Sequence, residues 1–148
     1  MLPTLNTRGD VVWISTYHRR GRGVVAGDIV SLRHPLDPEV GVIKRVVGMG
    51  GEWVVVDDGS GSAGDGVSLG GGVDGDRLAS GVEGTTEGGG PRYLCVPEGH
   101  CWVEGDHSAW SRDSRVYGPL PLGLVKGKVL GRIWPWRERR WFENPFQD

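Results

Sequence analysis

The sequence predicts an all-β protein, and three observations lead to this fold class. Glycine and proline are abundant, with 27 and 9 residues among 148, and such a composition favours turns over long helices. Short runs rich in β-branched and aromatic residues recur between these turns. The apolar content is modest, at 37%. A chain of this length is expected to form one domain, 1–148, with its own core.

Six such runs are expected to form strands. Each is rich in Val, Ile, Trp, Tyr or Leu and is bounded by Gly, Pro, Asp or other turn residues. In chain order they are 11–15, 29–32, 41–49, 53–56, 93–96 and 101–104. We expect the last two to pair as a hairpin across the turn at 97–99.

The composition changes between residues 58 and 90, which hold about half of the glycines, mixed with Ser, Asp, Thr and Glu. Such a segment cannot bury enough apolar surface to offset its ordering entropy. We therefore expect a flexible insertion, 58–90, within the domain. A glycine-rich phosphate loop is the alternative, but no Gly-x-x-x-x-Gly-Lys-Ser/Thr pattern supports it.

Charge and cysteine usage exclude several classes of protein. The formal net charge of −2 does not suggest a nucleic-acid-binding surface, and no apolar run reaches the ~18 to 20 residues of a membrane span. The basic run 18–23 is expected to be a solvated loop rather than an anion site.

Cys95, Cys101 and His100 are too few for a structural zinc site, so no metal is expected. The sequence leaves open whether Cys95 and Cys101 form a disulfide or remain two free thiols.

Lys44 and Arg45 interrupt the apolar run 41–49. Adjacent residues of a strand point to opposite faces, so one of the two cations is directed toward a packed core. An unpaired buried ammonium costs several kcal/mol, and a lysine in an apolar setting loses its proton more easily and can act as a general base. The other interpretation places Lys44 at a sheet edge with its amine in water.

The stretch 105–119 combines hydroxyl residues, carboxylates and arginines with little apolar periodicity. Hydrogen bonds from such side chains to the backbone can fix a loop. Asp113 and Arg115 could form an ion pair there, and Ser111 could hydrogen-bond a neutral amine. A solvent-exposed polar loop is the alternative.

Three blocks of the chain, in this order, resemble the boxes of the type I signal peptidases, which are serine peptidases with a Ser-Lys dyad. They are Met1-Leu2-Pro3-Thr4-Leu5, then Gly27-Asp28-Ile29-Val30 with Ile43-Lys44-Arg45-Val46-Val47-Gly48, and then Gly105-Asp106 with Ser111-Arg112-Asp113-Ser114-Arg115 and Tyr117-Gly118. Within the family, 96–102, 118–124 and the tail 141–144 are most similar to the mitochondrial inner membrane peptidase, to subunit 1 more than to subunit 2. The resemblance implies coiled antiparallel sheets that form a partly open barrel.

The resemblance also implies roles for individual residues. Lys44 matches the general base, Ser111 the hydroxyl that orients its amine, and Asp113 and Arg115 the pair that stiffens the site. Three positions match the lining of the pocket for the small residue before the scissile bond: Met1, Leu5 and Ile43. The expected reaction is acyl transfer without a cofactor, in which Lys44 takes the serine proton and returns it to the departing amine.

The chain departs from the family pattern at two places. His107 stands where the family usually has Asn. The family nucleophile is a serine immediately before the methionine of the first box, which is Met1 here, so that serine and the upstream membrane anchor are not in this sequence. We expect an N-terminally truncated form, whose activity as given is doubtful, with a truly inactive homologue as the other explanation.

The function implied by the resemblance is removal of presequences or sorting signals from proteins at the mitochondrial inner membrane, on its intermembrane-space side. The substrate would lie extended along a sheet edge, and a second subunit would complete a heterodimer. One alternative is a non-catalytic subunit that stabilises its partner. Another is a self-cleaving Ser-Lys protein, against which the third block argues. The tryptophans and arginines of 133–142 suit either a membrane interface or packing on the sheet.

Overall fold

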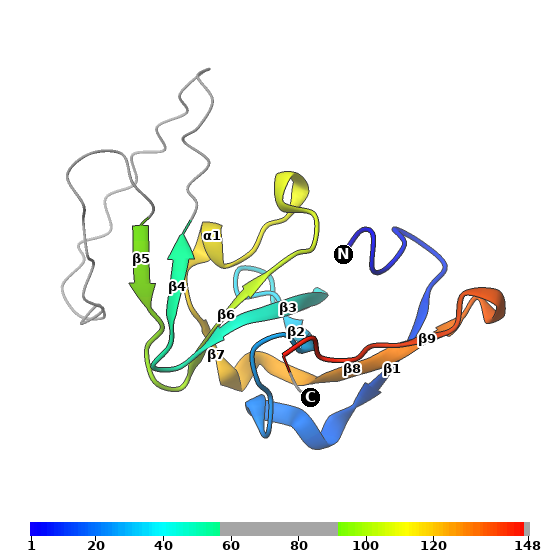
Figure 1. The fold of residues 1–148 in the computed structure, drawn as a ribbon, viewed down its shortest axis with the longest axis horizontal. Coiled ribbons are helices and arrows are strands. Elements are labelled where there is room, and N and C mark those ends of the chain that lie inside the picture. Colours follow the sequence, from blue (N-terminus) through cyan, green and yellow to red (C-terminus); the bar gives the residue numbers. More distant parts are fainter. Residues whose placement is uncertain (57–91, 147–148) are drawn as a thin grey trace.

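The computed structural model describes residues 1–56 and 92–146, which are predominantly β-structure (Figure 1). Their strands are β1 (Val11–Ser15), β2 (Ile29–Arg33), β3 (Gly41–Met49), β4 (Trp53–Val56), β5 (Arg92–Cys95), β6 (His100–Glu104), β7 (Leu120–Pro121), β8 (Val125–Trp134) and β9 (Arg140–Trp141). One short α-helix, α1, spans Ser114–Tyr117, and 3-10 turns cover Thr16–Gly21, Ser108–Trp110, Leu122–Leu124 and Trp136–Glu138. The insertion expected at 58–90 lies outside the described residues.

Seven strands form one antiparallel sheet in the order β1-β8-β2-β3-β6-β7, in which β9 also pairs with β8. The strands β4 and β5 form a separate two-stranded ribbon, which Figure 1 shows projecting from one end of the sheet. Within the described residues the outermost strands β1 and β7 do not pair with each other, so the sheet is not a closed barrel. The predicted all-β class and open antiparallel form are confirmed.

The main core follows from the alternation of side chains along the central strands. On β8, Val125, Gly127 and Val129 are buried, whereas Lys126 and Lys128 between them are more exposed, which is the period-two pattern of a strand with one packed face. The core consists of Val24, Val30, Leu32, Val46, Cys101, Val103, Leu120 and Val125. A smaller cluster of Val54, Val96 and Trp102 packs the ribbon against β6.

The strand β3 is an interior strand, which excludes the sheet-edge interpretation of Lys44. It pairs with β2 on one side and with β6 on the other, and Lys44 lies opposite the buried Val30. Val42 and Val46, two residues away on either side, share the face of Lys44 and pack in the core. The lysine side chain therefore leaves the strand on its packed face.

The predicted hairpin of 93–96 with 101–104 is wrong. β5 pairs with β4, whereas β6 pairs with β3 and with β7. The bends that follow β3 and β5 lie against one another, since the Gly51 N–H donates to Val96 O and the Val96 N–H donates to Glu52 O. The pair β3 and β6 and the pair β4 and β5 thus continue one another as a single antiparallel ladder that bends in its middle. In this ladder β5 and β6 are successive parts of the same side, and β3 and β4 form the other side.

Both cysteines are free thiols, which decides between the two alternatives left open by the sequence. Cys95 lies opposite Trp53 in the ribbon, and Cys101 lies opposite Met49 in the main sheet. Burial raises the pKa of the Cys101 thiol to about 12. Cys101 therefore stays protonated at neutral pH and acts as a small apolar core residue.

The aromatic rings near the C-terminus are only partly packed on the sheet. Trp13 on β1 and Trp141 on β9 meet across Gly131 of β8, with ring centroids 6.3 Å apart. The Arg139 guanidinium lies 4.5 Å from the centre of the Trp136 ring. Nevertheless Trp13, Trp134, Trp136 and Trp141 are 55% to 67% exposed, so the sheet does not cover them. None of the helices among residues 1–56 and 92–146 has the length and apolar content to cross a membrane.

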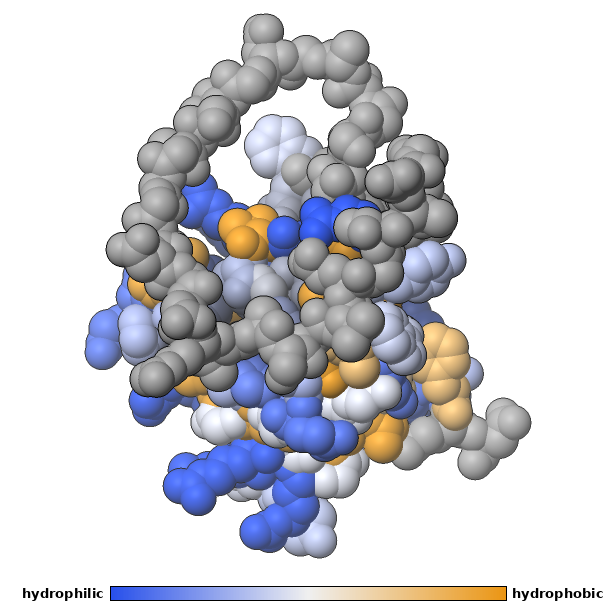
Figure 2. Space-filling model, turned by 90° about the vertical axis from the view of Figure 1, so that its left-hand side faces the viewer, coloured by the Kyte–Doolittle hydropathy of each residue, from blue (hydrophilic) through white to orange (hydrophobic). Residues whose placement is uncertain are grey.

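The side of the molecule that carries β4 and β5 has a mixed surface. Figure 2 shows hydrophobic and hydrophilic residues interspersed over the part of this side that is visible. Trp53 and Val55 on the outer face of β4 and Tyr93 on β5 are exposed, while Val54 between the first two is buried. The ribbon thus packs through one face only, as the period of two requires.

A buried ion pair joins the turn before β2 to β8 and to the C-terminal tail. The Lys128 Nζ lies 2.6 Å from Asp28 Oδ1, and the Asn144 Nδ2 donates to the same oxygen at 2.7 Å. The Val25 N–H donates to Asp28 Oδ2, and Asn144 also donates to Ala26 O. The contacts from Lys128, Val25 and the Asn144 amide thus converge on a carboxylate whose side chain is fully buried.

We expect Asp28→Ala to lower the free energy of unfolding by about 3 kcal/mol. The substitution leaves the Lys128 amine without its counter-charge and the Asn144 amide without one of its two acceptors. Urea denaturation measures the change, and Glu143→Ala, at the exposed neighbour of Asn144, serves as the control, with a change below about 0.5 kcal/mol. A loss below about 1 kcal/mol for Asp28→Ala would contradict the importance of this ion pair.

Candidate active site

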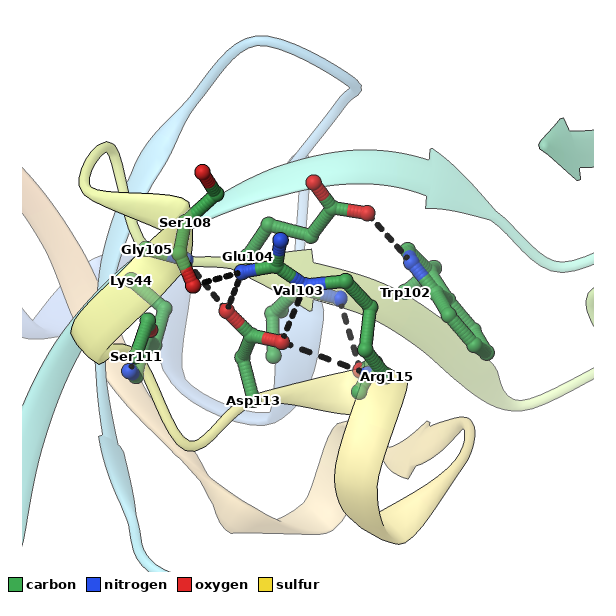
Figure 3. Close-up of polar contacts among 10 residues, drawn as sticks. Lys44, Trp102, Val103, Glu104, Gly105, Ser108, Ser111, Asp113 and Arg115 are labelled. Atoms are coloured by element: carbon green, nitrogen blue, oxygen red, sulfur yellow. Dashed lines mark hydrogen bonds and ion pairs between the residues drawn. The ribbon is translucent and has the colours of Figure 1, made fainter. Parts of the chain in front are cut away.

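Lys44 and Ser111, which are 67 positions apart in the chain, meet above the packed face of β3. The Lys44 Nζ donates a hydrogen bond to Ser111 Oγ at 2.6 Å, and Figure 3 shows both side chains beside the backbone of Gly105. A Cβ atom at Gly105 would overlap Ser111 Oγ and would lie 3.4 Å from Lys44 Nζ. Glycine at this position therefore permits the amine and the hydroxyl to approach each other.

Asp113 fixes the loop that carries Ser111. Its buried carboxylate accepts hydrogen bonds from the Gly105 N–H at 2.9 Å and from Arg115 Nε and Nη2 at 2.9 Å and 2.6 Å (Figure 3). It also caps α1 by accepting from the Arg115 N–H. Arg115 in turn donates to Ser108 O at 3.3 Å, so one ion pair connects the end of β6, the loop and the start of α1. The ion pair expected between Asp113 and Arg115 is confirmed.

Burial and charge shift two pKa values in this cluster. Burial alone would raise the pKa of Asp113, but hydrogen bonds from Arg115, Gly105 and Ser111 outweigh it and lower the pKa to about 2. Burial lowers the pKa of Lys44; the charge of Asp113 opposes this effect and the charge of Arg115 adds to it. At a given pH, Lys44 is therefore neutral more often than a fully exposed lysine.

A second charged cluster lies on the opposite face of β3. Arg45 donates from Nε and Nη2 to the two Asp106 oxygens at 2.9 Å and 3.1 Å and from Nη1 to Gly27 O at 3.1 Å. The Thr4 hydroxyl donates to Asp106 Oδ2. This cluster ties the N-terminal segment to the segment that follows β6. The sequence reasoning assigned no role to Thr4, Arg45 or Asp106, although the position of Arg45 beside Lys44 was the available signal.

A pocket of about 390 Å³ opens beside the contact between Lys44 and Ser111. Its lining comes from the N-terminal segment, β3 and the loop after β6, and consists of Met1, Leu2, Leu5, Asn6, Thr7, Lys44, Gly105, His107, Trp110 and Ser111. Met1 and Leu5, which the resemblance assigned to a substrate pocket, line this pocket. Ile43 is not among the lining residues, because it shares the face of Arg45 and not that of Lys44. His107 and Trp110 line the pocket without having been predicted to do so.

The arrangement is suited to proton transfer next to a pocket whose lining is part apolar and part polar. A lysine with a lowered pKa can accept a proton, a hydroxyl holds its amine, and an ionised carboxylate lies behind them. In the part of the chain that the structure describes, no group of three His, Cys, Asp or Glu side chains could hold a metal ion. The amine of Lys44 is thus placed to accept a proton from a nucleophile bound at the pocket.

Comparison with known proteins decides the family. The profile of the family described as "signal peptidase, peptidase S26" matches residues 1–134. The chain belongs to the signal peptidase family, peptidase S26. The three sequence blocks that suggested this family lie within the matched range, and two of them supply Lys44 and Ser111. The predicted membership is confirmed.

Within the S26 family, the chain is similar to proteins named mitochondrial inner membrane proteases. Mitochondrial inner membrane protease subunit 1 of Schizosaccharomyces pombe is 34% identical over all of this chain, which spans 75% of that protein. Mitochondrial inner membrane protease subunit 1 of Saccharomyces cerevisiae is 36% identical over all of this chain, which spans 66% of that protein. Mitochondrial inner membrane protease subunit 2 of Danio rerio is 35% identical over 91% of this chain and 60% of its own length. A crystal structure of signal peptidase I from Enterococcus faecalis V583 is 27% identical, with a TM-score of 0.44 over 70% of this chain and 93% of that one.

We expect the Lys44 amine to titrate below the ordinary lysine value of about 10.4, because burial disfavours the ammonium form. Nuclear magnetic resonance of the labelled amine measures this pKa directly. The unfolded chain keeps the proton to higher pH, so the contribution of Lys44 to the free energy of unfolding should rise with pH between the lowered folded pKa and about 10.4 and then level off. The raised pKa of Cys101 lowers the total over part of this range, so the rise is read from the difference between the parent and Lys44→Met.

Lys44→Met should abolish this rise, and Lys126→Met, at an exposed lysine on β8, should retain it. An unshifted amine, or a rise that survives Lys44→Met, would show that burial does not depress the proton affinity of Lys44.

Proposed function

We propose that this domain is the catalytic core of a serine endopeptidase with a Ser-Lys dyad, which removes presequences or sorting signals from proteins at the mitochondrial inner membrane. The observation that carries the proposal is the 2.6 Å contact between Lys44 Nζ and Ser111 Oγ at the wall of the pocket that Met1 and Leu5 also line. Membership of the S26 family and the similarity to proteins named mitochondrial inner membrane proteases support it. The intermembrane-space side of that membrane is part of the proposal.

In the proposed reaction Lys44 is the general base. Its neutral amine accepts the proton of the nucleophilic serine, which the family pattern places immediately before Met1, and the serine oxygen attacks the peptide carbonyl. The ammonium that forms then donates this proton to the departing amine. The Asp113 charge favours the protonated lysine, so the same carboxylate that limits the pKa shift in the resting site stabilises the amine after proton transfer.

The remaining residues of the site position these groups. Ser111 holds the Lys44 amine, and Asp113 with Arg115 holds the loop that carries Ser111. Met1 and Leu5 bound the pocket that accepts a small side chain before the scissile bond. Ile43 is assigned no contact with the substrate side chain, because it is not part of the pocket lining.

We expect Lys44→Met to reduce cleavage of presequence peptides by about 10²- to 10⁴-fold, because the reaction loses its general base. The assay uses the chain in a form that carries a serine immediately before Met1, and measures kcat/KM by mass spectrometry of the products. Lys126→Met is the matched control and should cleave at the parental rate. Turnover of Lys44→Met within about threefold of the parent would refute the proposed role of Lys44, and would favour a non-catalytic subunit.

We further propose that the domain works with a second subunit, since relatives are named both subunit 1 and subunit 2 of one protease. Its partner would be a homologous chain, and presequence-bearing proteins would be the substrates. The exposed tryptophans of β1, β8, β9 and the turn Trp136–Glu138 would lie in the interfacial layer of the membrane, a setting that suits indoles beside arginines.

We expect the double variant Trp136→Ser and Trp141→Ser to float less with vesicles of anionic phospholipid than the parent, because it removes two exposed indoles. Trp53→Ser is the matched control, since Trp53 is 56% exposed but lies on the ribbon. Equal flotation of the parent and the double variant would exclude the interfacial hypothesis.

A further inference from the structure

Trp110 has an unusual position for a tryptophan. It is 88% exposed, the highest value among the exposed large apolar side chains of the described residues. It also lines the pocket next to Lys44 and directly precedes Ser111 in the chain. An indole that packs on so little of its own protein contributes little to the core, so its position calls for another explanation.

The backbone beneath Trp110 is held although its ring is not covered. Trp110 ends the 3-10 turn Ser108–Trp110, where its N–H donates to His107 O at 3.3 Å. The Ser108 carbonyl of the same turn accepts from Arg115, the partner of Asp113. The ion pair that orders the loop of Ser111 therefore also holds the turn of Trp110. The ring is presented to the pocket by a fixed backbone, which lowers the entropic cost of binding a ligand there.

The pocket has two walls of different origin. One consists of Met1, Leu2 and Leu5 of the N-terminal segment, and the other consists of His107, Trp110 and Ser111 of the loop after β6. Under the proposed function, the first wall takes the residue before the scissile bond. The second wall carries Ser111, which holds the amine that donates a proton to the departing amine.

We propose that Trp110 is a specificity-determining residue that binds the side chain of the first residue after the scissile bond and favours a large apolar or aromatic one. The inference rests on the proposed function for the direction of the substrate. The chemistry is that of an exposed indole covered by an apolar side chain, with removal of both surfaces from water. The neighbouring His107 and Ser111 are polar, so the indole is the group of this wall that selects for apolar character.

Two peptides that differ only in the residue after the cleaved bond, Phe or Ser, test the proposal. Binding is measured first, by fluorescence anisotropy on the 148-residue chain with Lys44→Met, so that no cleavage interferes. We expect the Phe peptide to bind about tenfold more tightly than the Ser peptide. Trp110→Ala should reduce this ratio to about one, and Trp110→Phe should retain most of it. Trp136→Ala, at an exposed tryptophan outside the pocket, should leave it unchanged.

The same peptides are then compared by kcat/KM in the form that carries a serine before Met1. A ratio near tenfold that disappears in Trp110→Ala supports the inference, and the circular dichroism melting curve of the variant should be unchanged because the ring is exposed. The inference is overturned if Trp110→Ala weakens both peptides equally, if Trp136→Ala has the same effect, or if the preference follows the residue before the bond. A preference in binding that depends on Trp110, with no cleavage by any form, would refute the proposed peptidase and leave the binding site standing.

Discussion

A lysine amine held on the packed face of an interior strand is the constraint on which the rest of the site depends. Val42 and Val46 share that face with Lys44, and Val30 lies opposite it on β2. An amine in such a place needs a hydrogen-bond acceptor and a charge nearby that limits the cost of protonation. Ser111 supplies the acceptor and Asp113 the charge. The loop after β6 therefore has to be rigid, and the close contact at Gly105 is one consequence.

Because side chains alternate along β3, the neighbouring residues Lys44 and Arg45 make contacts on opposite faces of the sheet. Lys44 faces the pocket, whereas Arg45 faces Asp106 and Gly27 on the other side. Buried or half-buried ion pairs of this kind add little net stability compared with apolar packing, but they fix the relative positions of the segments that they join. Here they join the N-terminal segment, the turn before β2 and the segment after β6 to one another and to the strand that carries Lys44.

The sequence predicted strands β1 to β6, but it missed β7, β8 and β9, although β8 shows a local alternation of buried and exposed residues. The bounds of β3 and β4 match the expected runs, because glycines and a charged turn interrupt the β-branched residues on both sides. The pairing of β5 and β6 was wrong because a turn at 97–99 looks the same in a hairpin and in a ladder that bends. Distinguishing them requires knowledge of the neighbouring strand, which the local pattern does not contain.

The candidate site was predictable to a different extent for each residue. The apolar neighbours of Lys44 left open whether it is buried or lies at a sheet edge, and the family resemblance implied its contact with Ser111, since no local rule joins residues 67 positions apart. Ile43 was expected in the pocket by the same resemblance, and the period of two places it on the other face. Trp110 gave no signal in the sequence, because residue type alone does not reveal whether an indole is buried or exposed.

The ribbon of β4 and β5 offers a position at which this member of the S26 family can be engineered. Val56 and Arg92 are paired directly opposite each other, so the chain leaves and re-enters the described structure at neighbouring points (Figure 1). Segments of very different length can close such a gap, because loop-closure entropy grows only slowly with length. A short turn, an epitope or a fluorescent module can therefore be inserted between Val56 and Arg92 while the geometry around Lys44 is preserved.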